Sequence, residues 1–239
     1  MNKKHAIGAL LFDKDGTLVD FDRTWGPATE SVMRDMANGD AETFDRLVAV
    51  NHFDVAACRL KPSSPMIAGS HLDYGPGWAK ALGVQADAGF IHRMDTMFAE
   101  VGLQHLVPIR PLVPLFERLK ASGFPLGIAT NDGEAAARRQ MQALGIEPFL
   151  SYVAGYDSGH GPKPGPGMVR AFIQLTGLSP NNVAMVGDTL HDLHAARAAG
   201  ALAVAVLTGP EGASMRGTLA PYADLVFEDL DELLEYVGA

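Results

Sequence analysis

The sequence contains a single cysteine among 239 residues, and only 19 basic side chains against 28 acidic ones. One thiol forms neither an internal disulfide nor a thiolate zinc site, so disulfide-stabilised secreted scaffolds and zinc modules of that kind are excluded. The formal charge of −9 argues against general nucleic-acid binding, which needs a basic face. No apolar run approaches the roughly 20 residues that cross a bilayer. These absences leave a globular protein of ordinary composition, with 47% hydrophobic and 20% charged residues.

The amino-terminal segment is not typical of a signal peptide. The basic start, Met1–His5, precedes a short apolar run that ends at Phe12. Asp13, Lys14 and Asp15 follow this run directly, and no small-residue cleavage site comes after them. We therefore interpret the run as a buried strand and expect a soluble, cytoplasmic protein.

Short apolar runs predict the strands of a buried sheet. Each run is bounded by Gly, Pro, Asn or Asp and lacks the alternation of a half-exposed strand, which favours a parallel sheet covered on both faces. Segments with helical spacing follow the runs, so the expected fold class is α/β, with an open, mainly parallel, Rossmann-like sheet. The expected strands are Ile7–Phe12, Phe124–Ala129, Val183–Val186 and Leu202–Leu207, with Leu225–Phe227 as an edge strand.

The segment 21–107 interrupts this alternation. It contains helix-like segments and no convincing strand, and its strongest amphipathic stripe runs from Phe90 to Val101. A sheet domain does not need so long a helical stretch between its first two strands. We therefore expect a helical domain at 21–107, inserted into an α/β core formed by 1–20 and 108–239.

Polar residues gather where the expected strands end. Because ligands of open α/β sheets bind beyond the carboxyl ends of the strands, we expect these side chains to share one crevice. Three carboxylates would repel one another there and one lysine does not balance them, whereas a divalent cation such as Mg²⁺ would. Such a site would also bind phosphate, which indicates phosphoryl transfer to a carboxylate nucleophile. The residues concerned are Asp13, Asp15, Thr130, Lys163 and Asp188.

Four ordered motifs resemble those of the haloacid dehalogenase superfamily. The first motif is fairly specific and the Thr-Asn pair alone is weak, but all four in order make a strong resemblance. The insert looks like the helical cap of phosphoglycolate-phosphatase-like members, so the resemblance covers essentially the whole chain. The motifs are Asp13-x-Asp15-Gly16-Thr17-Leu18-Val19-Asp20, Thr130-Asn131, Lys163 and Gly187-Asp188-x-x-x-Asp192.

The resemblance implies a role for each motif residue. Asp13 would be the nucleophile that forms an aspartyl-phosphate, and Asp15 would be the general acid and base. Mg²⁺ would be held by Asp13, the backbone carbonyl of Asp15, and Asp188. Asp192 would orient a metal-bound water or Lys163. The residues expected to bind the phosphate group are Gly16, Thr17, Thr130, Asn131 and Lys163, with Thr130 donating a hydrogen bond and Lys163 neutralising charge.

The activity implied by the resemblance is Mg²⁺-dependent hydrolysis of a small phosphorylated metabolite. A C–halogen hydrolase would not need Asp15 or Asp188. A phosphonate hydrolase would need a suitable lysine in the insert, where only Lys61 and Lys80 lie well inside. A phosphomutase of the β-phosphoglucomutase kind shares the core chemistry and stays open. The alternative from another class is a catalytically silent regulatory module, which would be expected to lose Asp13 or Asp15.

Several residues near the motifs are expected to have structural roles and no part in catalysis. Lys14, in an extended segment, would point to the face opposite its two neighbours, which predicts a structural or surface role. His191 and His194 could share a helix face, but phosphate chemistry with a hard cation favours oxygen ligands. Cys58 is expected to be buried within the core.

We expect no nucleic-acid or membrane partner and leave monomer and homodimer open. Candidates in the insert for an anionic substrate group are Arg23, His52, Arg59, His71 and Arg93.

Overall fold

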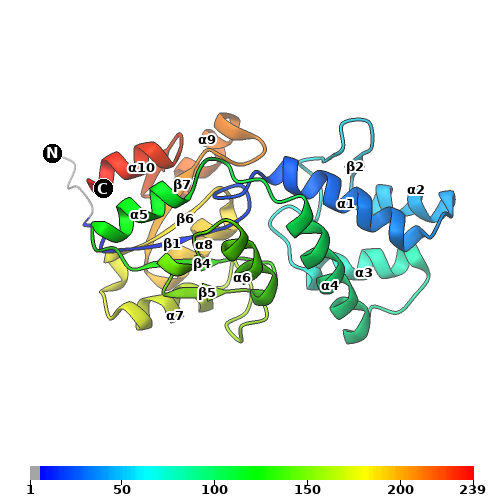
Figure 1. Cartoon of the computed structure of the whole chain (residues 1–239), viewed down its shortest axis with the longest axis horizontal. Coiled ribbons are helices and arrows are strands. Elements are labelled where there is room, and N and C mark those ends of the chain that lie inside the picture. The colour runs from blue at the N-terminus through cyan, green and yellow to red at the C-terminus, as the bar shows by residue number, and fades with distance from the viewer. Residues whose placement is uncertain (1–5) are drawn as a thin grey trace. The chain divides into compact units, whose positions relative to one another are not determined.

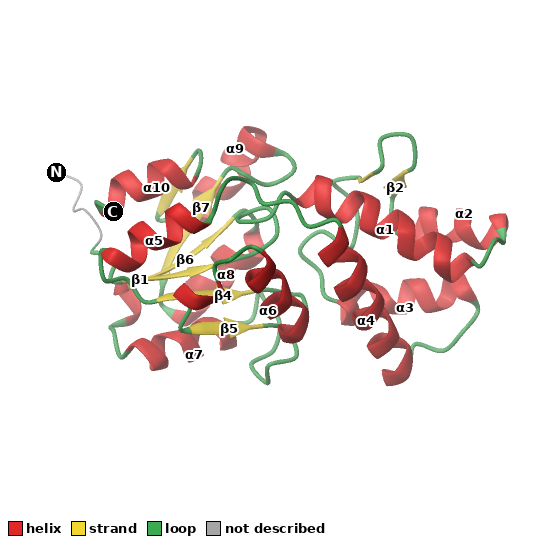
Figure 2. Cartoon of the chain, in the orientation of Figure 1, coloured by secondary structure: helices red, strands yellow, loops and turns green. Residues whose placement is uncertain are grey.

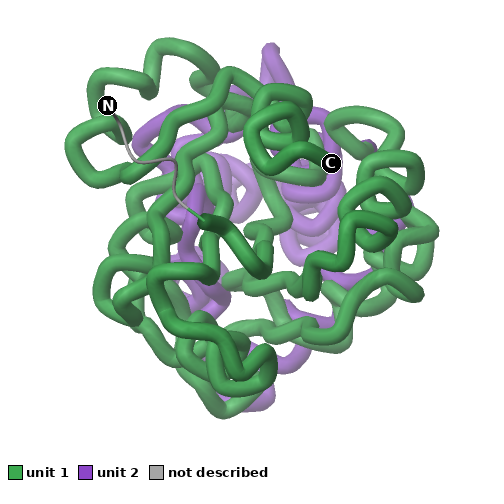
Figure 3. Tube along the Cα trace, turned by 90° about the vertical axis from the view of Figure 1, so that its left-hand side faces the viewer, with its two compact units in different colours: residues 1–20, 108–239 green, residues 21–107 purple. Residues whose placement is uncertain are grey.

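The computed structural model describes residues 6–239, so the basic start, Met1–His5, lies outside the described residues. The chain forms two compact units (Figure 3). Unit 1 contains the described residues up to Asp20 together with Pro108–Ala239, and unit 2 is Phe21–Val107. Among residues 6–239, none of the helices combines the length and the apolar character needed to span a bilayer.

Unit 1 is built on a six-stranded sheet in which all neighbouring strands are parallel (Figures 1 and 2). The strand order is β5-β4-β1-β6-β7-β8. The predicted fold class, an open parallel α/β sheet, is therefore confirmed. The strands are β1 (Ala9–Phe12), β4 (Leu126–Ala129), β5 (Tyr152–Ala154), β6 (Val183–Gly187), β7 (Leu202–Val206) and β8 (Leu225–Phe227).

Helices cover both faces of the sheet, which explains why its strands are apolar throughout. In β1, Leu10 and Phe12 pack with α5, α6 and α10 on one face, whereas Ala9 and Leu11 pack with α7 and α8 on the other. Side chains along a strand alternate between faces, so a strand buried on both sides needs no polar position. The helices of unit 1 are α5 (Val113–Ala121), α6 (Glu134–Ala143), α7 (Gly167–Thr176), α8 (Leu190–Ala199), α9 (Arg216–Leu219) and α10 (Leu230–Val237).

The direction of strand addition reverses at β1. From β1 the chain adds β4 and then β5 on one side, and afterwards β6, β7 and β8 on the other. The loops that leave β1 and β6 therefore diverge at their carboxyl ends and leave room for a ligand. This reversal fixes where a functional site of unit 1 is expected.

Unit 2 is mainly helical and has a core of its own. Its four helices enclose an aromatic centre in which the ring of Phe98 lies 5.5 Å from Trp78 and 6.2 Å from Trp25. Aspartates cap two of the helices, because Asp40 and Asp87 accept hydrogen bonds from main-chain N–H groups of the first turn. The helices are α1 (Phe21–Ala37), α2 (Ala41–Val50), α3 (His71–Leu82) and α4 (Ala88–Gln104).

The structure contains three strands that the sequence analysis did not predict. Unit 2 carries a two-stranded antiparallel hairpin, β2 (Phe53–Asp54) and β3 (Arg59–Leu60), so the expectation of an insert without strands was wrong. In unit 1, β5 pairs with β4 at the edge of the sheet. Strands of two or three residues are too short to display a periodicity, and of these short strands only Leu225–Phe227 was predicted.

Candidate active site

Main-chain hydrogen bonds of the sheet hold the motif residues at its carboxyl edge. The N–H of Asp13 donates to the carbonyl of Val186 at 2.8 Å, so β1 stays paired with β6 for one residue beyond its end. The N–H of Thr130 donates to the carbonyl of Ala154 at 3.0 Å and does the same for β4 and β5. Asp188 follows β6 directly. The sheet thus fixes the main chain at the start of three motifs.

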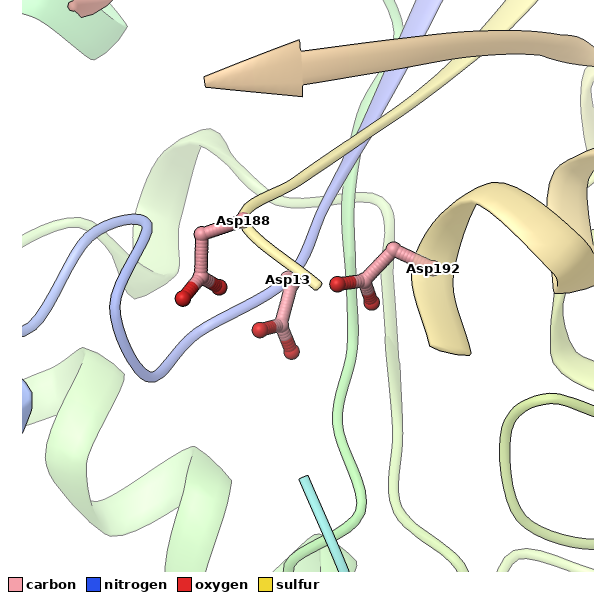
Figure 4. A group of neighbouring side chains, drawn as sticks. All are labelled: Asp13, Asp188 and Asp192. Atoms are coloured by element: carbon pink, nitrogen blue, oxygen red, sulfur yellow. The ribbon is translucent and has the colours of Figure 1, made fainter. Parts of the chain in front are cut away.

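Three buried carboxylates gather at this edge (Figure 4). Asp13, Asp188 and Asp192 are 6%, 7% and 0% exposed. One oxygen from each lies within 4.8 Å of the others, and within residues 6–239 this is the only such group of histidine, cysteine and acidic side chains. Neither His191 nor His194 belongs to it. The donors are hard oxygen atoms, which suit a hard divalent cation such as Mg²⁺.

Lys163 joins two of the carboxylates. Its Nζ lies 2.5 Å from an oxygen of Asp13 and 2.6 Å from an oxygen of Asp192. The main chain of Lys163 is held by Asn131, whose amide donates to its carbonyl at 2.9 Å and accepts from its N–H at 2.8 Å. The side chain of Asn131 therefore holds the lysine loop in place.

Both oxygens of Asp192 are engaged. One accepts the hydrogen bond from Lys163, and the other accepts from the hydroxyl of Thr189 at 2.7 Å and from its N–H at 3.1 Å. Thr189 and Asp192 form the capping box of α8. A carboxylate used in this way orients the lysine and is less available than Asp13 or Asp188 to hold a cation.

Two glycines lie so close to Asp188 that a side chain at either position would displace its carboxylate. A Cβ atom on Gly16 or on Gly209 would lie 2.2 Å from a carboxylate oxygen of Asp188. Gly16 also has a φ of +78°, a conformation that favours glycine. The hydroxyl of Thr17 donates to Asp188 at 3.3 Å. Gly16 and Thr17 thus lie around the metal-ligating candidate Asp188.

The loop after β7 belongs to the site, and the sequence analysis missed it. The hydroxyl of Thr208 donates to the carbonyl of Gly16 at 2.7 Å, and the next residue, Gly209, lies against Asp188. The available signal was its position, because this loop also follows a parallel strand. Its Thr-Gly pair resembles no motif that we identified, so it was not selected.

Lys14 is wholly buried, so the expectation that it points away from its neighbours was wrong. Its Nζ lies 2.6 Å from Asp15 and 2.9 Å from Asp132. The chain does not continue as an extended strand after Asp13: the carbonyl of Lys14 accepts hydrogen bonds from Leu18 and Val19, and the segment turns back at once. This turn carries the lysine side chain to the inside.

The electrostatics of the cluster are unfavourable for three ionised carboxylates. Burial, together with the charges of Asp192 and Asp15, raises the pKa of Asp13 to about 7 against the opposing effect of Lys163. Burial, Asp13 and Asp192 likewise raise the pKa of Asp188 well above its usual range. Burial lowers the pKa of Lys163, but Asp13 and Asp192 more than offset this and keep it charged. One ammonium among three carboxylates leaves the cluster two charges negative when all are ionised.

Thr130 and Asp15 complete the set of predicted residues. Thr130 is 1% exposed, and its hydroxyl oxygen accepts a hydrogen bond from the N–H of Asp132 at 3.1 Å, which leaves the hydroxyl proton for another acceptor. The side chain of Asp15 is 17% exposed. The cluster of Asp13, Lys163, Asp188 and Asp192 is thus flanked by one hydroxyl donor and one partly exposed carboxylate.

The candidates in unit 2 differ sharply in burial. Arg23, Arg59 and Arg93 are exposed, and so is His52. His71 is 5% exposed; its Nδ1 lies 2.5 Å from Asp95, and its buried Nε2 has no partner within the described residues. A separate correction concerns Cys58, which is only partly buried and donates to Glu30 at 3.3 Å.

Comparison with known proteins identifies the family. A family model of haloacid dehalogenase-like hydrolases matches residues 7–200. The chain belongs to this family. The predictions of the family and of an enzyme are therefore confirmed.

Similar proteins span the full length of this haloacid dehalogenase-like hydrolase. A phosphoglycolate phosphatase of Chromobacterium violaceum is 30% identical over 98% of both chains. Among solved structures, a HAD phosphatase from Thermococcus onnurineus has a TM-score of 0.66 at 21% identity and covers 97% of this chain and 98% of its own. A Thermotoga maritima protein provisionally assigned as a β-phosphoglucomutase has a TM-score of 0.68 at 18% identity, over 97% of this chain and 99% of its own. At these identities the two structures establish a shared fold.

Proposed function

We propose that the chain is a Mg²⁺-dependent phosphomonoester hydrolase that acts on a small phosphorylated metabolite. The observation that carries the proposal is the contact between the carboxylate of Asp13 and Nζ of Lys163 beyond the central strand. A lysine beside a carboxylate nucleophile offsets the charge that a phosphate group brings. The name of the Chromobacterium violaceum relative supports a phosphate ester, and phosphoglycolate is the first substrate to test.

In the proposed reaction the two aspartates of the first motif have different roles, Asp13 as the nucleophile and Asp15 as the general acid and base. A carboxylate oxygen of Asp13 bonds to phosphorus and the ester P–O bond breaks, while Asp15 gives its proton to the leaving oxygen. Water then attacks the aspartyl-phosphate, Asp15 takes a proton from that water, and inorganic phosphate is released. Thr130 donates its hydroxyl proton to a phosphate oxygen, and Lys163 balances charge on Asp13 and on the phosphate.

The residues present fit a divalent cation. The cluster offers oxygen donors to a cation. It is also two charges negative when ionised, and the pKa values of Asp13 and Asp188 are raised within it. A bound cation would offset the negative charge and lower both pKa values. Asp13, Asp188 and the main-chain carbonyl of Asp15 would hold Mg²⁺, while Asp192 stays with Lys163. When bound, the ion supplies positive charge against the phosphate oxygens.

A phosphomutase would use the same residues and differs only in what accepts the phosphoryl group. The similarity to the Thermotoga maritima protein extends to the fold, so the two activities are separated by assay. Release of inorganic phosphate from a panel of metabolite phosphates supports a hydrolase. Transfer to a sugar phosphate, with little phosphate released, would support the mutase.

Turnover of p-nitrophenyl phosphate and of the metabolite panel tests the mechanism. We expect activity with Mg²⁺, none with EDTA, and none in Asp13→Asn. Asp15→Asn should lose about 10²- to 10⁴-fold in kcat, the usual contribution of general acid–base catalysis. Asp45→Asn, an exposed aspartate of unit 2, is the matched control and should behave as the parent. Activity that survives EDTA or Asp13→Asn would refute the proposal.

A further inference from the structure

A buried lysine connects the loops that follow β1 and β4. Nζ of Lys14 lies 2.7 Å and 2.6 Å from the two carboxylate oxygens of Asp15, and 2.9 Å from an oxygen of Asp132. The lysine side chain is 0% exposed, whereas those of Asp15 and Asp132 are 17% and 21% exposed. The cation is therefore buried more deeply than either of its partners.

This depth of burial decides how Lys14 acts. A buried ammonium is strongly unfavourable unless it is paired, and the two carboxylates provide that pairing. Burial lowers the pKa of Lys14, but Asp132 and Asp15 more than offset it and keep the lysine charged. Because no surface of Lys14 is left for a substrate to touch, any effect on a reaction has to pass through the groups that Lys14 contacts, among them Asp15 and Asp132.

We propose that Lys14 is the positioning residue of the acid/base Asp15 and that Asp132 holds Lys14 in place. The inference rests on the proposed function, in which Asp15 transfers the protons. A general acid must lie within hydrogen-bond reach of the leaving oxygen, and the free rotation of an aspartate would place it there only part of the time. An ammonium that contacts both carboxylate oxygens restricts that rotation.

The second anchor links the acid/base to the phosphate-binding loop. Asp132 lies two residues after Thr130, and its N–H donates to the hydroxyl oxygen of Thr130. Lys14 therefore connects Asp15 to the loop that carries Thr130, the proposed hydrogen-bond donor to the phosphate group. The distance between the proton donor and the bound phosphate is set by this connection, in addition to the pairing of β1 with β4.

The decisive measurement compares two aryl phosphates in Lys14→Met. The value of kcat/KM covers the steps up to release of the leaving group, and phenolate needs a proton far more than p-nitrophenolate does. With phenyl phosphate, kcat/KM should fall on the order of 10²-fold, the size of effect expected for a misplaced catalytic group. With p-nitrophenyl phosphate the fall should be several times smaller. A purely structural ion pair would lower both values equally.

Matched variants separate this effect from general damage. Lys120→Met changes an exposed lysine of unit 1 and should leave both substrates unaffected. Lys14→Arg retains a charged donor and should recover part of the loss with phenyl phosphate. Asp132→Asn retains Lys14 but weakens its anchor, so it should show the same leaving-group dependence at about one tenth of the size. The double variant should lose no more than Lys14→Met, because both changes remove one connection.

The outcomes distinguish the two proposals. If Asp13→Asn is inactive but Lys14→Met and Asp132→Asn match the parent with both substrates, the positioning role is wrong and the proposed function stands. If Asp13→Asn stays active, the proposed function itself fails. If Lys14→Met does not fold, Asp132→Asn decides alone, and equal losses with both substrates in that variant would overturn the inference.

Discussion

Asp13 and Lys163 are separated by 150 positions in the sequence, yet their charged atoms lie 2.5 Å apart. The sequence analysis selected both residues, because each stands in a motif with a recognisable chemistry. The resemblance implied that Asp192 would orient a metal-bound water or Lys163, and in the structure Asp192 accepts from the ammonium of Lys163. The clamp of Asn131 on the main chain of Lys163 was not predicted, because it follows from packing between distant segments. Motifs thus predict which residues form the site, and only the fold assigns their contacts.

Lys14 shows how a local rule fails at the residue scale. The rule that successive side chains alternate applies to an extended chain. Here the strand ends at Phe12, and the chain turns back by hydrogen bonds to the carbonyl of Lys14. A glycine three positions after Asp13 was a signal of this turn, but the face on which Lys14 would fall depends on the turn geometry. Short sequences do not determine that geometry.

The loss of Lys163 should destabilise the folded chain. In Lys163→Met, Asp13 and Asp192 would lose the cation that both contact, and breaking a buried ion pair in this way costs about 3–5 kcal/mol. Urea unfolding at pH 8 in EDTA measures the change, because a pH above the raised pKa of Asp13 favours its ionised form. Lys120→Met serves again as the exposed control. An unfolding free energy equal to that of the parent would mean that water, rather than Lys163, solvates these carboxylates.

At the scale of elements, one helix cap in this fold also orients a residue of the site, whereas another only stabilises its own helix. Thr189 caps α8 and also holds Asp192 against Lys163. Asp229 caps α10 by accepting hydrogen bonds from the N–H groups of Asp231 and Glu232, and among residues 6–239 these bonds do not reach the carboxylate cluster. The helices that follow the strands of unit 1 were predicted from their spacing in the sequence. The dual role of the α8 cap was not, since it depends on a loop from elsewhere in the chain.

Substitution of the two caps should separate stability from activity. Thr189→Ala and Asp229→Ala should each lower the unfolding free energy by about 1 kcal/mol, the usual value of an N-cap. Only Thr189→Ala should also lower kcat, by about 10-fold, because Asp192 would lose the group that orients it. Thermal unfolding and phosphatase assays of the same preparations provide both numbers. Equal kcat values in the two variants would disprove the orienting role.

At the scale of the whole molecule, the charge of −9 has two different meanings. The acidic side chains of the carboxylate cluster are buried, whereas most of the acidic excess lies on exposed or partly exposed positions. A net charge counts both groups alike, so composition alone gives no sign of the buried cluster. The cytoplasmic location and the absence of nucleic-acid and membrane partners remain predictions, and monomer and homodimer both stay open.

The pH dependence of stability should reveal the buried cluster. The pKa of Asp13 rises from 3.8 to about 7 on folding, so between these values the folded chain binds more protons than the unfolded chain. The unfolding free energy of the metal-free protein should therefore fall as the pH rises from about 4 to about 7. Because the proposed Mg²⁺ site requires ionised carboxylates, the stabilising effect of Mg²⁺ should be larger at pH 8 than at pH 5.

Thermal unfolding in EDTA and in Mg²⁺ across this range measures both effects. Asp13→Asn should reduce the response to Mg²⁺, since it removes one proposed ligand. A rise in melting temperature with Mg²⁺ that is the same at pH 5 and pH 8 would mean that the ion binds elsewhere on the acidic surface. The mechanism would then need a different source of charge neutralisation.

The central place of β1 in the sheet also has a consequence for synthesis of the chain. Of the six strands of this sheet, β1 comes first in the sequence, yet its neighbours β4 and β6 begin at Leu126 and Val183. While the ribosome adds the intervening residues, β1 exposes two unpaired edges and a wholly apolar sequence, which is a hazard for aggregation. The helices of unit 2 emerge during this interval and rely on nearer contacts. Recovery of catalytic activity would thus report one of the last events in the maturation of a newly made chain.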